Sequence, residues 1–332
     1  MNAVMEGRRP RIVVTRVLPG RALERLSAAG DMLLHEEDRA PTRRELLAYV
    51  READALLCLI TERIDDEVFD AAPRLRIVSN YAVGVNNIDI AAATRRGILV
   101  TNTPNVLTET TADFTWALIL AVCRRLGEGE RLVRSGEWTG WSPMQLLGSD
   151  VYGKTLGIIG FGRIGQAVAR RAAGFGMPVL YHSHRPADPD VERSLNARHA
   201  ALEDLLREAD IVSIHVPLTS ETQHMIDAAR LGLMKPTAFL VNTARGPIVD
   251  EAALVQALHN GVIAGAGLDV FAREPELEPG LVDLPNAVLA PHLGSASVEA
   301  RTAMADLAAE NLISALAGRR PPHPVNPEVL PS

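Results

Sequence analysis

The sequence has few cysteines, few aromatic residues and no long hydrophobic run. Only two cysteines, Cys58 and Cys123, occur in 332 residues, and they form no Cys-x-x-Cys pair. We therefore expect two buried thiols in a reducing compartment and no disulfide framework. No apolar run approaches the length of a membrane span, and the N-terminal residues contain no signal-peptide core. These absences predict a cytoplasmic protein without a membrane segment.

Net positive charge and metal-ligand clusters are lacking as well. The formal net charge of −7 gives no electrostatic attraction for nucleic acid or for an anionic membrane. No His, Cys or carboxylate cluster has the spacing of metal ligands, so we predict no metal site. What is there is an ordinary globular composition, 47% hydrophobic and 23% charged, with a length that favours two domains.

A glycine motif organises the second half of the chain. The stretch Val151–Gly165 reads VYGKTLGIIGFGRIG, a short apolar run followed by Gly-x-Gly-x-x-Gly and a helical pattern. In a dinucleotide-binding turn, Gly160 permits the tight turn, Gly162 lets the backbone approach the pyrophosphate, and Gly165 lets the helix pack on the sheet. The phosphates then lie at the positive end of that helix. The alternative is an ordinary glycine-rich turn, but the strand-then-helix context favours a dinucleotide cofactor site.

Short apolar runs alternate with helical patterns along most of the chain, which is typical of parallel sheets covered by helices. The first hundred residues already form one such α/β unit, and the alternation restarts at Val151. The expected strands are Arg11–Val17, Asp54–Ile60, Arg76–Ser79, Ile98–Thr101, Lys154–Ile159, Val179–His182, Ile211–Val216, Ala238–Asn242, Ala264–Val270 and Val288–Ala290.

Three other segments interrupt or follow this alternation. Thr108–Arg125 is a long helical pattern that is apolar nearly all round in its middle, so we expect it to be buried between domains or subunits. Gly127–Gly148 shows no clear period and is expected to be a long loop or arm. Ser297–Ala317 is expected to be a helix with Ser295 or Ser297 as its N-cap and Gly318 just past its end.

Three charged or titratable residues follow expected strands of the second half, where α/β sheets place ligands. Arg245 could hold a substrate carboxylate through two hydrogen bonds. His292 could exchange a proton with a carbonyl or hydroxyl group, and Glu274 could orient that imidazole. Taken singly, each could instead be a salt-bridge partner, a solvated carboxylate or a structural histidine. Together, beside a dinucleotide, they fit hydride transfer to a 2-oxo acid.

Motifs over nearly the whole chain carry a resemblance to a known family. The sequence is similar to the D-isomer-specific 2-hydroxyacid dehydrogenases, and within them to the glyoxylate/hydroxypyruvate reductases. The motifs, besides the glycine turn, are NYAVGVNNIDI (80–90), TNTPNVLTETTAD (101–113), WTGWSPMQLLG (138–148), HVPLTSET (215–222), NTARGPIVDEAAL (242–254), GAGLDVFAREP (265–275) and APHLGSAS (290–297).

The resemblance implies an activity and roles for the catalytic residues. The expected reaction is NAD(P)H-dependent reduction of a small 2-oxo acid to the D-2-hydroxy acid. Arg245 would bind the carboxylate and carbonyl of the substrate, His292 would donate the proton, and Glu274 would orient His292. The substrate carboxylate would also contact backbone N–H groups of Ala82, Val83 and Gly84, with Ser295 near the same pocket.

The resemblance further implies the domain organisation, the assembly and the cofactor residues. A discontinuous, flavodoxin-like substrate domain (residues 1–102 and 294–332) would contain an inserted Rossmann domain (residues 103–293), with the active site in a cleft that closes by hinge motion. Subunits would pair through Thr108–Arg125 and the following arm into a homodimer. The residues lining the cofactor would be Thr110, Gly160, Gly162, Arg163, Ile164, Gly165, Ser183, His184, Arg185, Val216, Thr222, Thr243, Ala244 and Asp269.

The choice between NADPH and NADH is argued from the end of the second strand after the glycine turn. NAD enzymes usually place an acidic residue there to bind the ribose 2′-hydroxyl. This chain has no acid before Asp188, and Ser183 and Arg185 could instead bind a 2′-phosphate. His184 stands where related NADPH reductases commonly carry Arg. We therefore predict NADP(H) as the preferred cofactor, with NAD(H) also possible.

Other functions remain open at this point. D-lactate-type, phosphoglycerate, phosphite and formate dehydrogenases belong to the same family. We expect no C-terminal regulatory extension of the phosphoglycerate type. Val83 stands where phosphite enzymes carry Lys, and Glu274 stands where formate enzymes carry Gln. A reductase of a larger keto acid such as 2-ketogluconate is an alternative, as is a dinucleotide-sensing, corepressor-like binding protein on the same fold.

Overall fold

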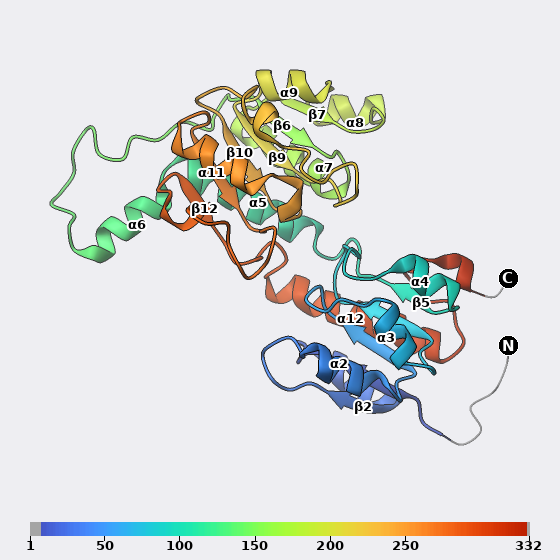
Figure 1. The fold of residues 1–332 in the computed structure, drawn as a ribbon. Helices are drawn as coiled ribbons and strands as arrows, with labels where there is room; N and C mark the ends of the chain where they lie inside the picture. Colours follow the sequence, from blue (N-terminus) through green and yellow to red (C-terminus); the bar gives the residue numbers. More distant parts are fainter. Residues whose placement is uncertain (1–7, 331–332) are drawn as a thin grey trace. The chain divides into compact units, whose positions relative to one another are not determined.

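The computed structural model describes residues 8–330 and divides the chain into two compact units (Figure 1). Unit 1 consists of the chain up to Leu107 and the segment from Ala296 onward, and unit 2 is Thr108–Ser295. Each unit contains one sheet whose named strands are all parallel. The expected fold class is therefore confirmed. The domain boundaries after residues 102 and 293 stay predictions.

Unit 1 is a five-stranded sheet with the order β2-β1-β3-β4-β5, which is the flavodoxin-like order. Its strands are β1 (Arg11–Val14), β2 (Asp31–Leu34), β3 (Ala55–Cys58), β4 (Ile77–Asn80) and β5 (Leu99–Thr101). Its helices are α1 (Ala22–Ala29), α2 (Arg43–Val50), α3 (Asp66–Ala71), α4 (Ile90–Arg95) and α12 (Val298–Leu316).

Successive side chains along the strands of unit 1 point to opposite faces of the sheet, and helices cover both faces. Side chains such as Val13, Leu56 and Val78 point to one face, where they pack with apolar residues of α2, α3 and α4. Because successive side chains point to opposite faces, Ser79 points to the other face, and its hydroxyl donates to the carbonyl of Ala308 in α12 at 2.9 Å. The C-terminal helix therefore belongs to the core of unit 1.

Unit 2 is a seven-stranded sheet with the order β12-β11-β10-β9-β6-β7-β8, the Rossmann order extended by one strand. Its strands are β6 (Leu156–Ile159), β7 (Val179–His182), β8 (Ala197–His199), β9 (Ile211–Ile214), β10 (Phe239–Asn242), β11 (Gly265–Leu268) and β12 (Ala287–Leu289). Its helices are α5 (Thr108–Cys123), α6 (Leu126–Ser135), α7 (Arg163–Ala172), α8 (Pro189–Ser194), α9 (Leu202–Glu208), α10 (Ala228–Leu231) and α11 (Glu251–His259).

Two strands were not predicted from the sequence, and both lie at sheet edges. Within the described part of the chain, β2 pairs only with β1, and β8 pairs only with β7. Their side chains are partly exposed, so neither segment needs the apolar run that marks a central strand. The predicted central strands are found, although several predictions ran past the observed end; β1, for example, ends at Val14 and not at Val17.

The expectation that Gly127–Gly148 is entirely a loop or arm is wrong for its first part. Helix α6 occupies Leu126–Ser135, and Figure 1 shows it extending, with the chain that follows, away from the sheet of unit 2. Two glycines lower the helix propensity of this segment and obscured the pattern. Ion pairs one turn apart, Arg125 with Glu128 and Glu130 with Arg134, support the helix.

Helix α5 is buried mainly against its own sheet. Its buried residues include Trp116, Ile119 and Cys123, and they pack with residues of β6, β7, β9, β10 and α7. Leu120, on the opposite face of α5, is 38% exposed. The apolar character that the sequence shows nearly all round this helix is therefore explained only in part by the fold of unit 2.

Both cysteines are free and buried, as expected. Burial raises the pKa of Cys58 well above its usual value and that of Cys123 to about 12, so both thiols stay protonated. Within residues 8–330, no helix is long and apolar enough to cross a membrane.

Candidate active site

The glycine turn after β6 has the geometry that the sequence predicts. Gly160 has φ +97°, and a Cβ atom there would lie 2.6 Å from the carbonyl carbon of His215, so only glycine fits. A Cβ atom on Gly165 would overlap the carbonyl oxygen of Gly160, whereas one on Gly162 would meet no atom within 4 Å. Helix α7 begins at Arg163, so its first N–H groups, including those of Arg163 and Ile164, have no acceptor within the helix and can face a phosphate.

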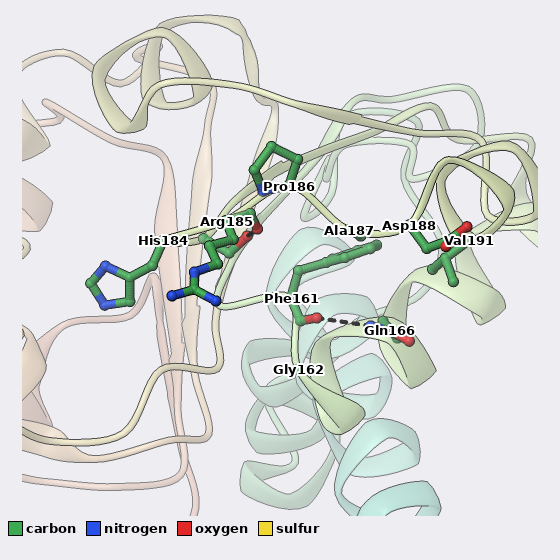
Figure 2. Close-up of a pocket in the computed structure, with 10 residues that line it drawn as sticks. Phe161, Gly162, Gln166, His184, Arg185, Pro186, Ala187, Asp188 and Val191 are labelled. Atoms are coloured by element: carbon green, nitrogen blue, oxygen red, sulfur yellow. Dashed lines mark hydrogen bonds between the residues drawn. The ribbon is translucent and has the colours of Figure 1, made fainter.

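A pocket of about 610 Å³ lies between this turn and the loop after β7 (Figure 2). The side chain of Gln166 donates to the carbonyl of Phe161 at 3.0 Å on one side of it. The carboxylate of Asp188 accepts from the N–H of Asp190 at the start of α8. The lining residues are Phe161, Gly162, Gln166, Ser183, His184, Arg185, Pro186, Ala187, Asp188 and Val191.

The structure brings three of the predicted cofactor residues to this pocket on one loop. His184 and Arg185 are exposed and Ser183 is half-buried. The Ser183 hydroxyl donates to the carbonyl of Arg185 at 2.6 Å, which leaves its oxygen able to accept or to turn toward a ligand. The pocket therefore offers a guanidinium, an imidazole and a hydroxyl group.

The remaining predicted cofactor residues lie elsewhere in unit 2. Val216 and Thr222 follow β9, and the Thr222 hydroxyl donates to the carbonyl of Pro217 at 2.6 Å, which closes that loop. Thr243 and Ala244 follow β10, and the Thr243 hydroxyl lies 2.9 Å from that of Thr115 in α5. Thr110 lies in the first turn of α5 and Asp269 follows β11. Their contact with a cofactor stays a prediction.

His292 and Glu274, eighteen residues apart in sequence, are paired in the structure. Nδ1 of His292 lies 2.8 Å from Oε2 of Glu274, and the side chains are 28% and 34% exposed. The other oxygen of Glu274 accepts from the N–H of Phe271 at 3.0 Å. Burial works to raise the pKa of Glu274, but the hydrogen bond and charge of His292 outweigh it, and the pKa is lowered. An ionised Glu274 therefore accepts from Nδ1–H and leaves Nε2 of His292 for a substrate.

Asp269 holds the turn that carries His292. Its carboxylate, which is fully buried, accepts from the N–H groups of Leu293 at 2.6 Å and Gly294 at 2.7 Å. Burial raises the pKa of Asp269, and these two hydrogen bonds oppose that rise. His292 itself has φ +55°, a conformation that costs a non-glycine residue free energy. The two hydrogen bonds that Asp269 accepts from Leu293 and Gly294 stabilise this conformation of His292.

Arg245 interacts electrostatically with Glu274 of this pair. It follows β10, and its Nη1 donates to the carbonyl of Ala244 at 2.6 Å. Burial lowers the pKa of Arg245, and the nearby charge of Glu274 opposes that shift. Because a guanidinium remains protonated even so, the charge of Arg245 acts on the carboxylate that is paired with His292.

The sequence interpretation missed two residues that hold this arrangement. Gly246 lies so close to the next loop that a Cβ atom would overlap the carbonyl group of Phe271 and the nitrogen of Ala272. Glu251, at the start of α11, accepts from the N–H of Ala272 at 2.7 Å. The motif NTARGPIVDE contains both residues, but nothing in sequence spacing shows that this segment packs on the loop of Glu274.

The predicted substrate loop of unit 1 follows β4. The carbonyl oxygens of Ala82, Val83 and Gly84 accept from Thr103 N–H, Asn102 Nδ2 and Asn80 Nδ2 at 2.9, 2.7 and 2.8 Å. Among the described residues, no hydrogen bond from the N–H groups of these three is found, so those groups can serve an anion. Ser295, the last predicted substrate residue, ends unit 2, and Ser297 is the N-cap of α12.

Metal ligation has no support in the described part of the chain. No group of three or more His, Cys, Asp or Glu side chains there is placed to hold a metal ion. The side chains of the site offer two chemical functions. The site can bind a carboxylate through Arg245 and hold or deliver a proton at Nε2 of His292.

Comparison with known proteins identifies the family of this chain. Residues 116–294 match the NAD binding domain of the D-isomer specific 2-hydroxyacid dehydrogenases. The chain is 56% identical over 326 residues to glyoxylate reductase of Thermococcus kodakarensis, covering 97% of this chain and 98% of that relative. Glyoxylate reductase of Pyrococcus furiosus is 53% identical over 326 residues, with 97% of each chain covered.

Solved structures agree over nearly the whole length. A Thermus thermophilus protein has a TM-score of 0.89 at 51% identity, covering 95% of this chain and 99% of that chain. The NADPH-dependent glyoxylate/hydroxypyruvate reductase of Sinorhizobium meliloti, in complex with NADP and malonate, has a TM-score of 0.85 at 37% identity, covering 98% and 99%. The resemblance that the motifs predicted is confirmed.

Gly246→Ala tests whether the close approach of the Arg245 and Glu274 loops matters for the site. A Cβ atom must push Phe271 and Ala272 away, which we expect to lower kcat/KM at least tenfold and to destabilise the protein by about 1–3 kcal/mol. Steady-state kinetics and thermal denaturation measure the two effects. Gly174→Ala is the matched control, because a Cβ atom there meets nothing within 4 Å. Equal kinetics for both variants would contradict the prediction.

Proposed function

Because this chain belongs to the D-isomer specific 2-hydroxyacid dehydrogenase family, we propose that it reduces a small 2-oxo acid, glyoxylate or hydroxypyruvate, to the D-2-hydroxy acid with a nicotinamide cofactor. The observation that carries the proposal is the 2.8 Å pairing of His292 with Glu274, in the unit that holds the glycine turn. The glyoxylate reductases that align over 97% of the chain support the substrate class.

The residues of the glycine turn fit a dinucleotide. The open space at Gly162 and the N-terminus of α7 form a cradle for the pyrophosphate, with backbone N–H groups of Arg163, Ile164 and Gly165 as donors. When bound, the reduced nicotinamide supplies the hydride that passes to the keto carbon of the substrate. Thr110, Val216, Thr222, Thr243, Ala244 and Asp269 are proposed to line the rest of the cofactor.

The chain's own residues supply binding and the proton. The guanidinium of Arg245 holds the substrate carboxylate and carbonyl. His292 donates a proton from Nε2 to the carbonyl oxygen, and ionised Glu274 holds the ring through Nδ1–H and stabilises its protonated form. The N–H groups of residues 82–84, together with Ser295, are our proposal for the remaining substrate contacts.

We also propose that NADP(H) is the preferred cofactor and that NAD(H) is accepted more weakly. Ser183, His184 and Arg185 line the pocket beside the glycine turn, and Arg185 is the cation available to a ribose 2′-phosphate there. Among the described residues, the only carboxylate that lines this pocket is Asp188, and it caps α8. An enzyme that binds the ribose 2′-hydroxyl of NAD(H) usually has an acidic residue at the end of this strand, β7.

We further propose that the protein is a homodimer and resides in the cytoplasm. Six large apolar side chains of α6 and the chain after it are between 49% and 83% exposed, which is more than a monomer usually leaves in one segment. Leu120 of α5 is also exposed, at 38%. The six side chains are Leu126, Val133, Trp138, Trp141, Met144 and Leu147. The two buried, free thiols fit a reducing compartment.

Initial rates followed by nicotinamide absorbance test the proposed reaction. Glyoxylate, hydroxypyruvate and 2-ketogluconate are each offered with NADPH and with NADH. We expect glyoxylate or hydroxypyruvate with NADPH to be fastest, because the site combines a carboxylate clamp with a proton donor. Turnover of 2-ketogluconate alone would replace the proposal by a reductase of larger keto acids. No turnover with any pair would favour a dinucleotide-sensing binding protein.

His292→Ala is the control that assigns this turnover to the proposed site. Loss of the general acid should lower kcat by about 10²–10⁴-fold, while the Kd for the cofactor, measured by nicotinamide fluorescence, changes less than about twofold because His292 lies outside the glycine turn. Unchanged turnover would contradict the role of His292.

Arg185→Ala tests the preference for NADPH. Loss of one charge-assisted hydrogen bond at an exposed site should raise the Kd for NADPH about 5- to 30-fold, and leave that for NADH nearly unchanged. Arg193→Ala is the matched control, since Arg193 is exposed on α8 and pairs with Asp190. Equal losses with both cofactors would contradict a contact between Arg185 and the 2′-phosphate.

Sedimentation equilibrium tests the dimer. We expect a mass twice that of the 35.8 kDa chain, and a shift toward monomer for Trp141→Asp combined with Leu147→Asp, because a charge cannot be buried there without a partner. Val282→Asp, at a 64% exposed site outside this segment, is the control. A wild-type monomer would contradict the proposal, and a dimer that survives the double substitution would contradict this interface.

A further inference from the structure

A buried tyrosine anchors the far end of the loop that lines the pocket beside the glycine turn. Tyr181, in β7, is fully buried. Its hydroxyl accepts from the N–H of Ala187 at 2.7 Å and donates to Oε1 of Glu192 in α8 at 2.6 Å. Burial, and then the hydrogen bond to Glu192, raise the pKa of Tyr181, so the hydroxyl keeps the proton that it donates. Two linked bonds of this kind strengthen each other in a buried site.

A histidine anchors the near end of the same loop. Nε2 of His199, in β8, lies 3.1 Å from the carbonyl oxygen of Ser183, and a carbonyl can only accept, so Nε2 carries the proton in this pair. Between the two anchors, the Ser183 hydroxyl bonds to the carbonyl of Arg185. Residues 183–187 are therefore held at both ends, and the Ser183 hydroxyl, which has one proton, turns from the Arg185 carbonyl when it donates to a phosphate.

The ring of Tyr181 also joins this loop to the glycine turn. It stacks on Phe161, with ring centroids 3.9 Å apart and an interplanar angle of 18°, and His199 meets it edge-on at 5.2 Å. Phe161 stands between Gly160 and Gly162 and lines the pocket together with His184, Arg185 and Ala187 (Figure 2). One aromatic side chain thus contacts both walls of the proposed cofactor pocket.

We propose that Tyr181 and Glu192 are positioning residues for the discrimination between NADPH and NADH, acting through the Ala187 N–H to hold residues 183–187 where Ser183 and Arg185 meet the 2′-phosphate. The inference rests on the proposed preference for NADPH. The two cofactors differ only at that phosphate. If the loop must first become ordered when the phosphate binds, the affinity for NADPH falls, while the affinity for NADH changes little. Neither residue lines the pocket, so neither is a contact residue.

Tyr181→Phe removes the anchoring hydroxyl and keeps the ring that stacks on Phe161. We expect the Kd for NADPH to rise about 5- to 20-fold, the loss of one buried hydrogen-bond pair, while the Kd for NADH and kcat at saturating cofactor change less than about twofold. Exchange of the Ala187 amide hydrogen with deuterium should become faster. Tyr152→Phe is the matched control, since Tyr152 is 77% exposed.

A series at Glu192 separates positioning from general stability. Glu192→Ala should reproduce the effect of Tyr181→Phe on NADPH, and Glu192→Gln, which retains an acceptor oxygen for the Tyr181 hydroxyl, should restore most of the discrimination. Thermal denaturation checks that each variant folds. Because Glu192 lies on a half-exposed helix, we expect its variants to fold, and they test the inference even if Tyr181→Phe does not fold. If the role of these residues is purely structural, the substitutions should lower the melting temperature and weaken the binding of both cofactors equally.

The outcomes distinguish this inference from the function on which it rests. A wild-type protein that binds NADPH and NADH equally would overturn the proposed preference and the inference with it. A wild-type protein that prefers NADPH, with variants that keep the preference or lose both cofactors in parallel, would overturn the inference alone. A loss confined to NADPH, with rescue by Glu192→Gln, supports it.

Discussion

Parallel pairing is the constraint from which the rest of unit 2 follows. Each strand must be followed by a crossover before the chain can return beside it, so the carboxyl ends of its strands share one edge of the sheet. The glycine turn after β6, the loop after β7, Arg245 after β10 and His292 after β12 lie at such ends. Residues up to 132 positions apart in sequence thereby belong to one functional edge, and the chemistry of the proposed site depends on that arrangement.

Buried polar groups then determine the shape of the loops at this edge. A buried carboxylate or hydroxyl is costly unless it is hydrogen-bonded, and three such groups of unit 2 are bonded to backbone N–H groups of loops at this edge. Asp269 holds the turn of His292, Glu251 holds the loop of Glu274, and Tyr181 holds the loop beside the cofactor pocket. The side chains proposed to contact ligands therefore lie on loops that residues further inside keep in place.

Much of this arrangement could be predicted from the sequence because it leaves local signals. Central strands are continuous apolar runs, the glycine turn has a fixed spacing, and Arg245, Glu274 and His292 each follow a predicted strand. Edge strands and the glycine-containing helix α6 were missed because burial, which produces the periodic pattern, is slight there. Gly246 and Glu251 were missed for another reason, since their partners are loops that sequence spacing does not place beside them.

The sequence by itself determined the family and the two parallel α/β sheets, and it supplied the residues that we propose to bind a carboxylate, transfer a proton and bind a phosphate. These properties depend on residue type and on order along the chain. Only the tertiary structure decided that Glu274 pairs with Nδ1 of His292, that Asp269 supports the His292 turn, and that Tyr181 links the glycine turn to the loop of Arg185. Such contacts join residues distant in sequence, and a hydrogen bond forms only where folding brings donor and acceptor within about 3 Å of each other.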